Sequence, residues 1–335
     1  MKGKEKLKSL GVELPLFPLT SVGSFPKPDY VKEARKNFPA GHIKRKAAED
    51  RATRYWLKVQ EEFGYDVLVH GEMERGDMVA YFGEELGGFQ NGDPEEPVRS
   101  YGNRFWIPPE ITGKVFWRAP MTVKSWQFAQ SLTSLPMKGM LTGPATIYDW
   151  SLDGFYGSRR EAVADIALSL RREIEALIVA GAKIIQIDEP SLAHVWKDFP
   201  TLKKAFHLML DGLQESAYFI MHTCYGEDVF EKIYPEMLTL PVDNLDIELA
   251  NSNMDLLKVI AEFPATKDLS VGVVDVHTHE IESVDLVRDR IRRSLEVIPK
   301  DKLWLGPDCG LKTRTVAEAI GKLKVIAEAR KLVFR

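Results

Sequence analysis

From about residue 136 onward, short apolar and β-branched runs alternate with longer stretches whose apolar residues recur at a helical period. This alternation predicts repeated strand–helix units and therefore a parallel sheet. Amphipathic helices are expected at residues 158–181 and 284–299, among others. Six strands are expected within residues 137–147, 183–192, 218–227, 244–252, 269–280 and 302–313.

Two earlier apolar runs, residues 16–26 and 65–75, flank a polar helical stretch at 44–64 and bring the expected strand count to eight. Eight parallel strands predict an α/β fold, a single (β/α)8 TIM barrel formed by one domain over residues 1–335. A doubly wound open sheet is the alternative, but it places its chemistry at one switch point. Here polar residues follow most of the strands, namely Ser24, Glu72, Asp188, Glu189, His222, Cys224, Glu248, His277, Asp308 and Cys309.

Residues 85–120 interrupt the strand–helix rhythm with a stretch rich in glycine, proline and aromatic residues. Such a segment between the second and third units predicts an inserted β-hairpin or lid.

Composition narrows the class of protein. The chain has 335 residues, of which 44% are hydrophobic and 28% charged, which is typical of a globular protein and not of a disordered one. The net charge of -4 gives no reason to expect a nucleic-acid partner. Because neither a signal-peptide core nor an apolar run of roughly 20 residues occurs, we expect a cytoplasmic protein without a membrane span.

The sequence contains only two cysteines, and both follow predicted strands. Cys224 lies two residues after His222, so both side chains point to the same side of a strand. Glu248 ends the next strand and Cys309 ends the last one. A His-x-Cys pair alone more often packs in a core, but placement of both cysteines at strand ends favours a metal site. Imidazole, thiolate and carboxylate ligands suit zinc better than magnesium or calcium.

The charge of such a site indicates its chemistry. Two thiolates and one carboxylate around Zn²⁺ leave a net charge of about -1, which makes the ion a poor activator of water. A substrate thiol that coordinates the ion would instead lose its proton. The predicted reaction is attack of this sulfur on an alkyl group.

Further polar residues are expected on the same face. Glu72, Asp188 and Glu189 supply carboxylates that can hold the ammonium group of an amino-acid substrate. His277 can donate a proton to a leaving group, with His279 as an alternative on the same side.

These residues belong to a set of ordered motifs that resembles the catalytic domain of cobalamin-independent methionine synthase. The resemblance covers nearly the whole chain. Its motifs are SVGSFP at 21–26, HGEMERGDMVAYFGE at 70–84, SYGNR at 100–104, KGMLTGPATI at 138–147, DWS at 149–151, IQIDEP at 185–190, HTCY at 222–225, IE at 247–248 and PDCGLKTR at 307–314.

The resemblance implies roles for the matching positions. It implies that the zinc ligands are His222, Cys224, Glu248 and Cys309, and that His277 is the proton donor. It implies that homocysteine or methionine is bound by Val22, Gly23, Ser24, Glu72 and Asp188. It implies contact with the methyl donor at Arg104, Phe105 and Trp150, with His194 at a further donor-contact position.

The methyl donor is less closely fixed by the resemblance. His194 stands where the family usually has a glutamate, Phe105 stands where it commonly has a smaller residue, and the family's additional N-terminal barrel has no counterpart in this chain. We therefore expect a methylcorrinoid donor, either methylcobalamin or a corrinoid protein, with methyltetrahydrofolate as the alternative.

Two other functions compete with methionine formation. Methyl transfer to another thiol, such as coenzyme M, uses similar ligands, but a sulfonate thiol has no ammonium for Glu72 and Asp188 to hold. A non-catalytic barrel stabilised by zinc is the alternative of another class. Structural zinc sites usually draw four ligands from local loops, whereas these ligands come from separate strand ends.

Overall fold

The structure is a computed structural model, which describes residues 3–93, 95, 97–99, 105–224 and 229–333. Its helices are α1 (Gly3–Ser9), α2 (Asp29–Asn37), α3 (Ile43–Phe63), α4 (Met78–Glu85), α5 (Val123–Gln130), α6 (Pro144–Asp149), α7 (Arg159–Ala180), α8 (Leu192–Val195), the 3₁₀ helix η1 (Trp196–Asp198), α9 (Phe199–Leu210), α10 (Phe230–Met237), α11 (Leu257–Glu262), α12 (Val284–Val297) and α13 (Val316–Val333). Its strands are β1 (Gly87–Gln90), β2 (Val98–Arg99), β3 (Phe105–Trp106), β4 (Glu110–Phe116), β5 (Lys138–Thr142), β6 (Leu152–Asp153), β7 (Ile184–Asp188), β8 (Tyr218–Thr223), β9 (Asn244–Ile247), β10 (Asp268–Val274) and β11 (Leu303–Pro307).

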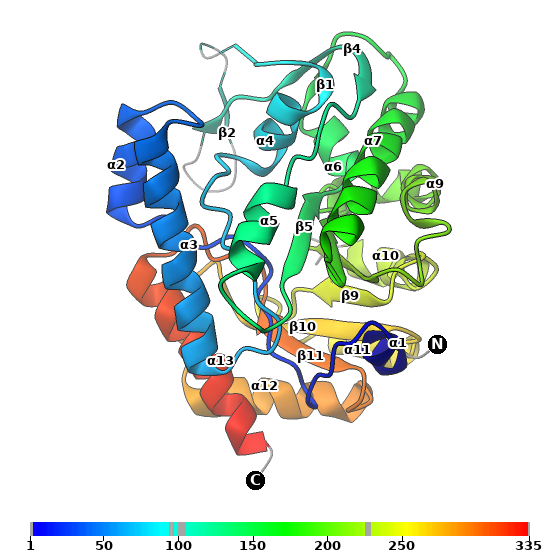
Figure 1. The fold of residues 1–335 in the computed structure, drawn as a ribbon. Coiled ribbons are helices and arrows are strands. Elements are labelled where there is room, and N and C mark those ends of the chain that lie inside the picture. Colours follow the sequence, from blue (N-terminus) through cyan, green and yellow to red (C-terminus); the bar gives the residue numbers. More distant parts are fainter. Residues whose placement is uncertain (1–2, 94, 96, 100–104, 225–228, 334–335) are drawn as a thin grey trace.

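Six strands form one parallel sheet in the order β11-β10-β9-β8-β7-β5. Every residue of these six strands is buried, because helices cover the sheet, as is typical of parallel sheets. Figure 1 shows the long helices α3, α7, α12 and α13 on the outside of the strands. All six strands predicted from residue 136 onward are therefore confirmed, as are the helices α3, α7 and α12.

The two earlier apolar runs contribute isolated bridges instead of strands. Leu19 bridges Leu305 of β11, Thr20 bridges Val67, and Leu68 bridges Met137 just before β5, all in parallel orientation. Gly71, which bridges Ser24, and Glu72 have positive φ values of 88° and 58°, which lie outside the strand region and end the second segment there. The expected closed barrel is thus confirmed only as an α/β fold with a six-stranded parallel sheet and bridged segments.

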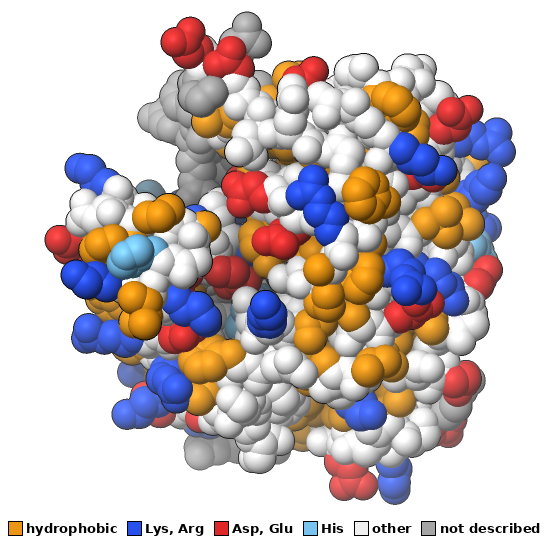
Figure 2. All heavy atoms as spheres, turned by 45° about the horizontal axis from the view of Figure 1, so that its top comes forward, with side chains coloured by type: hydrophobic (Ala, Val, Ile, Leu, Met, Phe, Trp, Pro, Cys, Tyr) orange, Lys and Arg blue, Asp and Glu red, His pale blue; other side chains and the backbone are white. Residues whose placement is uncertain are grey.

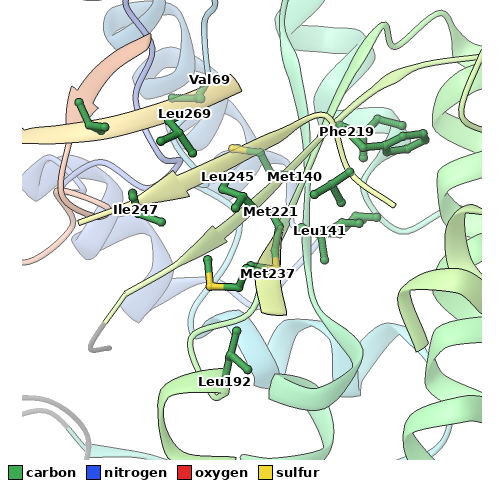
Figure 3. Packing of buried hydrophobic residues seen from close by; sticks show 14 of the residues in the cluster. Val69, Met140, Leu141, Leu192, Phe219, Met221, Met237, Leu245, Ile247 and Leu269 are labelled. Carbon is green, nitrogen blue, oxygen red and sulfur yellow. The ribbon is translucent and has the colours of Figure 1, made fainter. Parts of the chain in front are cut away.

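Successive residues of β7 and β8 face opposite sides, which separates two apolar clusters. Ile184 of β7 and Tyr218 and Ile220 of β8 pack with Leu7 of α1 and with Trp304 in a small cluster. The odd-numbered apolar residues of β7 and β8 join a second, larger cluster formed with the surrounding helices. Figure 3 shows part of this larger cluster, in which Phe219 and Met221 of β8 lie among apolar side chains from neighbouring strands and helices.

The residues between the second bridged segment and β5 form the expected hairpin. β1 pairs with β4 in antiparallel orientation, and β2 pairs in the same way with β3. β4 also pairs with the short strand β6, which ties the insertion to the segment after α6. The inserted hairpin predicted within residues 85–120 is therefore confirmed, and its role as a lid stays a prediction.

Two surface properties bear on possible partners. None of the described helices is both long and apolar enough to cross a membrane. On the face that Figure 2 shows, basic, acidic and hydrophobic side chains are intermixed, as the nearly balanced total charge would suggest.

Candidate active site

A cavity of about 1360 Å³ lies where the strands β7, β8, β10 and β11 end. This is the end of the sheet at which α/β enzymes bind their substrates. Of the residues singled out in the sequence, the cavity is lined by Val22, Gly23, Ser24, Glu72, Trp150, Asp188, His194, His222, Cys224, His277 and Cys309. Arg104 lies outside the described residues, and only the backbone of Phe105 is described.

Three of the four candidate metal ligands converge at one place. The ligand atoms of His222, Cys224 and Cys309 all lie within 4.8 Å of one another, and the two sulfur atoms are 3.7 Å apart. His222 and Cys224 are buried, and Nε2 of His222 has no hydrogen-bond partner among the residues that the structure describes. A buried imidazole nitrogen facing two sulfur atoms fits a zinc ion, which prefers nitrogen and sulfur ligands.

The other ring nitrogen of His222 has a separate partner. Its Nδ1 lies 3.3 Å from Oδ1 of Asp246, a buried residue of β9. A carboxylate at the second nitrogen of a metal-binding histidine fixes the ring and raises its basicity. Sequence reasoning missed Asp246. Its position two residues before Glu248 was a usable signal, because alternate residues of a strand point to the same side.

Glu248 lies beside this group without joining it. Its Oε1 accepts a hydrogen bond of 2.9 Å from Nδ2 of Asn251, and its Oε2 lies 3.5 Å from Nε2 of His277. Burial lowers the pKa of His277, but the contact with Glu248 outweighs burial, so that the pKa lies above its ordinary value. Glu248 therefore holds the candidate proton donor, and its role as a zinc ligand stays a prediction.

His279, the alternative proton donor, points elsewhere. Its side chain is exposed, and its Nδ1 lies 3.0 Å from a carboxylate oxygen of Glu318. His279 is also absent from the cavity lining. Of the two histidines, only His277 is placed to act on a bound substrate.

Asp188 is held by a chain of buried polar groups that runs along the interior of the sheet. Nε2 of Gln186 donates to Oδ1 of Asp188 over 2.7 Å and to the carbonyl oxygen of Val22 over 2.8 Å. The ammonium group of Lys138 donates in turn to Gln186 over 2.5 Å. Burial raises the pKa of Asp188 to about 7 against the opposing charge of His222. Bringing a cation close to Asp188 therefore relieves the cost of its buried charge.

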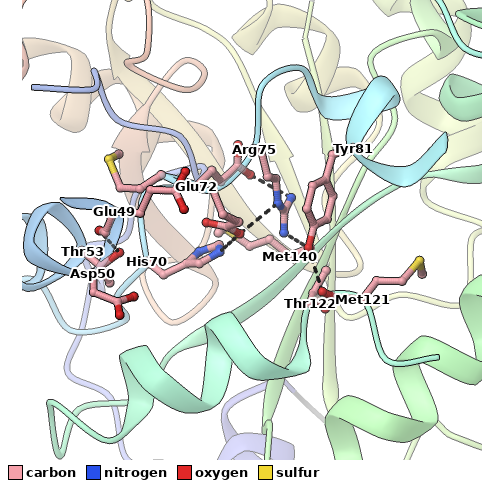
Figure 4. Close-up of polar contacts among 12 residues, drawn as sticks. Glu49, Asp50, Thr53, His70, Glu72, Arg75, Tyr81, Met121, Thr122 and Met140 are labelled. Atoms are coloured by element: carbon pink, nitrogen blue, oxygen red, sulfur yellow. Dashed lines mark hydrogen bonds and ion pairs between the residues drawn. The ribbon is translucent and has the colours of Figure 1, made fainter. Parts of the chain in front are cut away.

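Glu72 is fixed from two sides (Figure 4). Its backbone has a φ of 58°, a conformation that non-glycine residues rarely adopt. The buried guanidinium of Arg75 donates to Oε1 of Glu72 over 3.1 Å and to the carbonyl oxygen of Met140 over 2.8 Å. Backbone strain of this kind clusters at functional sites. Sequence reasoning missed Arg75, although it lies only three residues after Glu72.

Glu189 is a correction to the sequence prediction. It was expected to face an amino-acid ammonium together with Asp188, but its carboxylate accepts hydrogen bonds of 3.0 Å from the backbone N–H groups of Ala145 and Thr146. These are the second and third residues of α6, whose N-cap, Gly143, offers no side chain. Because neighbouring residues of a strand point to opposite sides, Glu189 caps this helix while Asp188 faces the cavity.

An aromatic pair lines the cavity near the insertion. Trp150 follows α6 and Trp106 belongs to β3, and their ring centroids are 6.4 Å apart with an interplanar angle of 56°. Indole rings at a cavity wall provide a surface for a flat ring. Trp106 was not predicted, because the resemblance pointed to the neighbouring Phe105.

Comparison with known proteins decides the family. Residues 17–332 match the family described as cobalamin-independent synthase, catalytic domain. The chain belongs to this family. Among its relatives are 5-methyltetrahydropteroyltriglutamate–homocysteine methyltransferases, 41% identical over 334 residues in Bacillus licheniformis and 41% identical over 331 residues in Haemophilus influenzae. Each alignment covers 96% of this chain but only 43% of the relative, so the chain spans less than half the length of these proteins.

Two solved structures of similar length resemble this chain. A B12-independent methionine synthase from a Shewanella species, solved with selenomethionine, has a TM-score of 0.82 at 25% identity and covers 96% of this chain and 98% of its own. A putative vitamin-B12 independent methionine synthase from Listeria monocytogenes has a TM-score of 0.73 at 20% identity, covering 95% and 99% of the two chains. The second likeness shows the fold alone.

The expectation of a corrinoid donor finds no support in these comparisons. The family description and the Shewanella structure are both of cobalamin-independent proteins, and the curated relatives are named for a pteroylglutamate donor. The departures at His194 and Phe105 that favoured a corrinoid are single positions within a match that covers nearly the whole chain.

Proposed function

We propose that this chain transfers a methyl group from a methyltetrahydropteroyl donor to the sulfur of homocysteine, which forms methionine. The observation that carries the proposal is the placement of His222, Cys224 and Cys309 within one cavity with Glu72 and Asp188. A thiol-binding group and an ammonium-binding group in one cavity match the two ends of an amino-acid thiol.

In this proposal zinc is held by His222, Cys224 and Cys309, with Glu248 as the fourth candidate. Zinc supplies one effect when bound, which is to lower the pKa of a coordinated thiol so that its sulfur is a thiolate at neutral pH. Glu72 and Asp188 hold the substrate ammonium, and the backbone of Val22, Gly23 and Ser24 shapes the wall beside it.

His277 is the proposed proton donor to the demethylated pterin. Its Nε2 lies beside the carboxylate of Glu248, which favours the protonated ring that a general acid needs. Trp150 is the proposed stacking surface for the pterin ring, with His194 on the same cavity lining. The names of the curated relatives support this donor class.

We also infer that the bridged segments complete a (β/α)8 barrel in one domain. Residue 19 bridges β11, residue 20 bridges residue 67, and residue 68 bridges the residue before β5. The two edge strands of the sheet are thereby connected through the N-terminal segments.

The proposed function is tested by a methionine-formation assay with zinc-loaded protein and homocysteine. Three donors are compared, namely methyltetrahydrofolate with one glutamate, the same donor with three glutamates, and methylcobalamin. We expect turnover with a folate donor and its loss in the protein stripped of zinc. Turnover with methylcobalamin alone would overturn the proposed donor, and absence of methionine with all three donors would overturn the proposed reaction.

A further inference from the structure

Lys27 is a cationic residue of the cavity that none of the roles described so far uses. It follows the SFP motif and lines the same cavity as Glu72 and the candidate metal ligands. Its half-buried ammonium group donates to the carbonyl oxygen of Glu72 over 3.2 Å. Among the described residues, no carboxylate oxygen lies within 4.0 Å of this ammonium group, so its charge is not balanced by an ion pair.

Two of the other cations that line the cavity, Arg35 and Lys32, are already engaged. Arg35 donates to the carboxylate of Glu49 over 2.9 Å and to the backbone carbonyls of Met73 and Glu74. Lys32 is exposed and forms an ion pair of 2.9 Å one turn away on its own helix. Neither arrangement resembles that of Lys27, which is more buried than Lys32 and whose ammonium group has, within the part of the chain that the structure describes, a neutral backbone acceptor only.

The proposed substrate leaves one charged group without an oppositely charged partner. Glu72 and Asp188 account for the ammonium of homocysteine and the metal ligands account for its sulfur, whereas residues 22–24 offer its carboxylate only neutral groups. Because Lys27 donates to the backbone carbonyl of Glu72, its ammonium group lies on the cavity wall beside the residue whose carboxylate faces the proposed substrate ammonium. An amino-acid headgroup carries the same two charges on adjacent atoms.

We propose that Lys27 binds the carboxylate of the homocysteine substrate, an inference that rests on the proposed function. Burial and the charge of Arg35 lower the pKa of Lys27 to about 8. A carboxylate arriving at this position offsets both effects and favours the charged ammonium. Glu72 then acts twice, because its side chain faces the substrate ammonium and its carbonyl oxygen orients Lys27.

The test measures binding by isothermal titration calorimetry on zinc-loaded protein, independently of turnover. Homocysteine is compared with its decarboxylated analogue, an aminopropanethiol that keeps the thiol and the ammonium. The variant is Lys27→Met, which keeps most of the side-chain length without charge. Lys32→Met is the matched control, because it removes a lysine from the same cavity wall.

We expect Lys27→Met to weaken homocysteine binding by about tenfold to a hundredfold and to leave binding of the analogue within about twofold. Lys32→Met should change neither, and Lys27→Arg should recover part of the loss. If both ligands weaken equally in Lys27→Met, the residue only positions Glu72 and the proposal fails. The proposal also fails if Lys27→Met leaves homocysteine binding unchanged. A KM of the donor that rises with its number of glutamates in this variant would then indicate that Lys27 contacts the donor instead. Absence of homocysteine binding by the unaltered protein would instead contradict the proposed function itself.

Discussion

Replacing Asp188 by asparagine separates substrate binding from metal binding. Asparagine has nearly the same shape, and its amide oxygen can still accept the 2.7 Å hydrogen bond from Gln186. The change removes only the negative charge that faces the proposed substrate ammonium. A charge-assisted hydrogen bond contributes about 1.5–3 kcal/mol, so the KM for homocysteine should rise about tenfold to a hundredfold. Zinc content should not change, because the group of converging ligand atoms does not include Asp188.

The assay is steady-state methionine formation at saturating donor, with zinc measured on the same samples. Glu84→Gln is the control, since Glu84 is an exposed carboxylate that lines the same cavity. An unchanged KM for homocysteine in Asp188→Asn would refute the assignment of Asp188 to the ammonium. Loss of zinc from this variant would refute the separation of the two roles.

Three further predictions concern metal, stability and donor. Cys309→Ser should weaken zinc binding by more than about a hundredfold in competition with a chromophoric chelator, since even outer partners of ligands contribute tenfold to a hundredfold; equal affinity would contradict its role. Burial raises the pKa of Glu189 from 4.5 to about 7, so the folded state keeps a proton that the unfolded state loses and stability should fall by up to about 3 kcal/mol between these pH values. Glu189→Gln should remove this pH dependence from the urea midpoints of unfolding measured at pH 5 to 8, even if the glutamine side chain lowers stability by a constant amount at every pH. The same pH dependence in the variant and the unaltered protein would rule the explanation out. Trp150→Ala should raise the KM for the donor about tenfold and leave that for homocysteine unchanged, and a rise confined to homocysteine would count against stacking.

Much of the fold could be predicted because its signal is periodic. The six parallel strands are short runs rich in apolar and β-branched residues, and α7 and α12 repeat their apolar residues at the helical period, so pattern alone located them. The first two segments carry similar apolar runs but pair through single-residue bridges, and the second segment ends at the positive φ values of Gly71 and Glu72. Residue pattern does not reveal such local backbone conformations.

The candidate site shows the same division. His222, Cys224 and Cys309 were found because the carboxyl ends of parallel strands lie at the same end of the sheet, independently of the conformation of the loops. Arg75 and Lys27 were missed because their roles depend on a turn that places one at the side chain and the other at the backbone of Glu72. Trp106 was missed because its place in the cavity depends on the path of the inserted hairpin.

The adjacent carboxylates of the DEP sequence show how tightly β7 constrains evolution of this site. Asp188 and Glu189 differ by one methylene group, yet one faces a ligand cavity and the other holds a helix. The two residues differ in role because neighbouring residues along the strand point to opposite sides of the sheet. A one-residue insertion or deletion within β7 would exchange them, placing an acid with the wrong reach in the cavity and leaving the start of α6 without its cap. Among relatives, insertions and deletions should therefore occur in the inserted hairpin and be absent from β7.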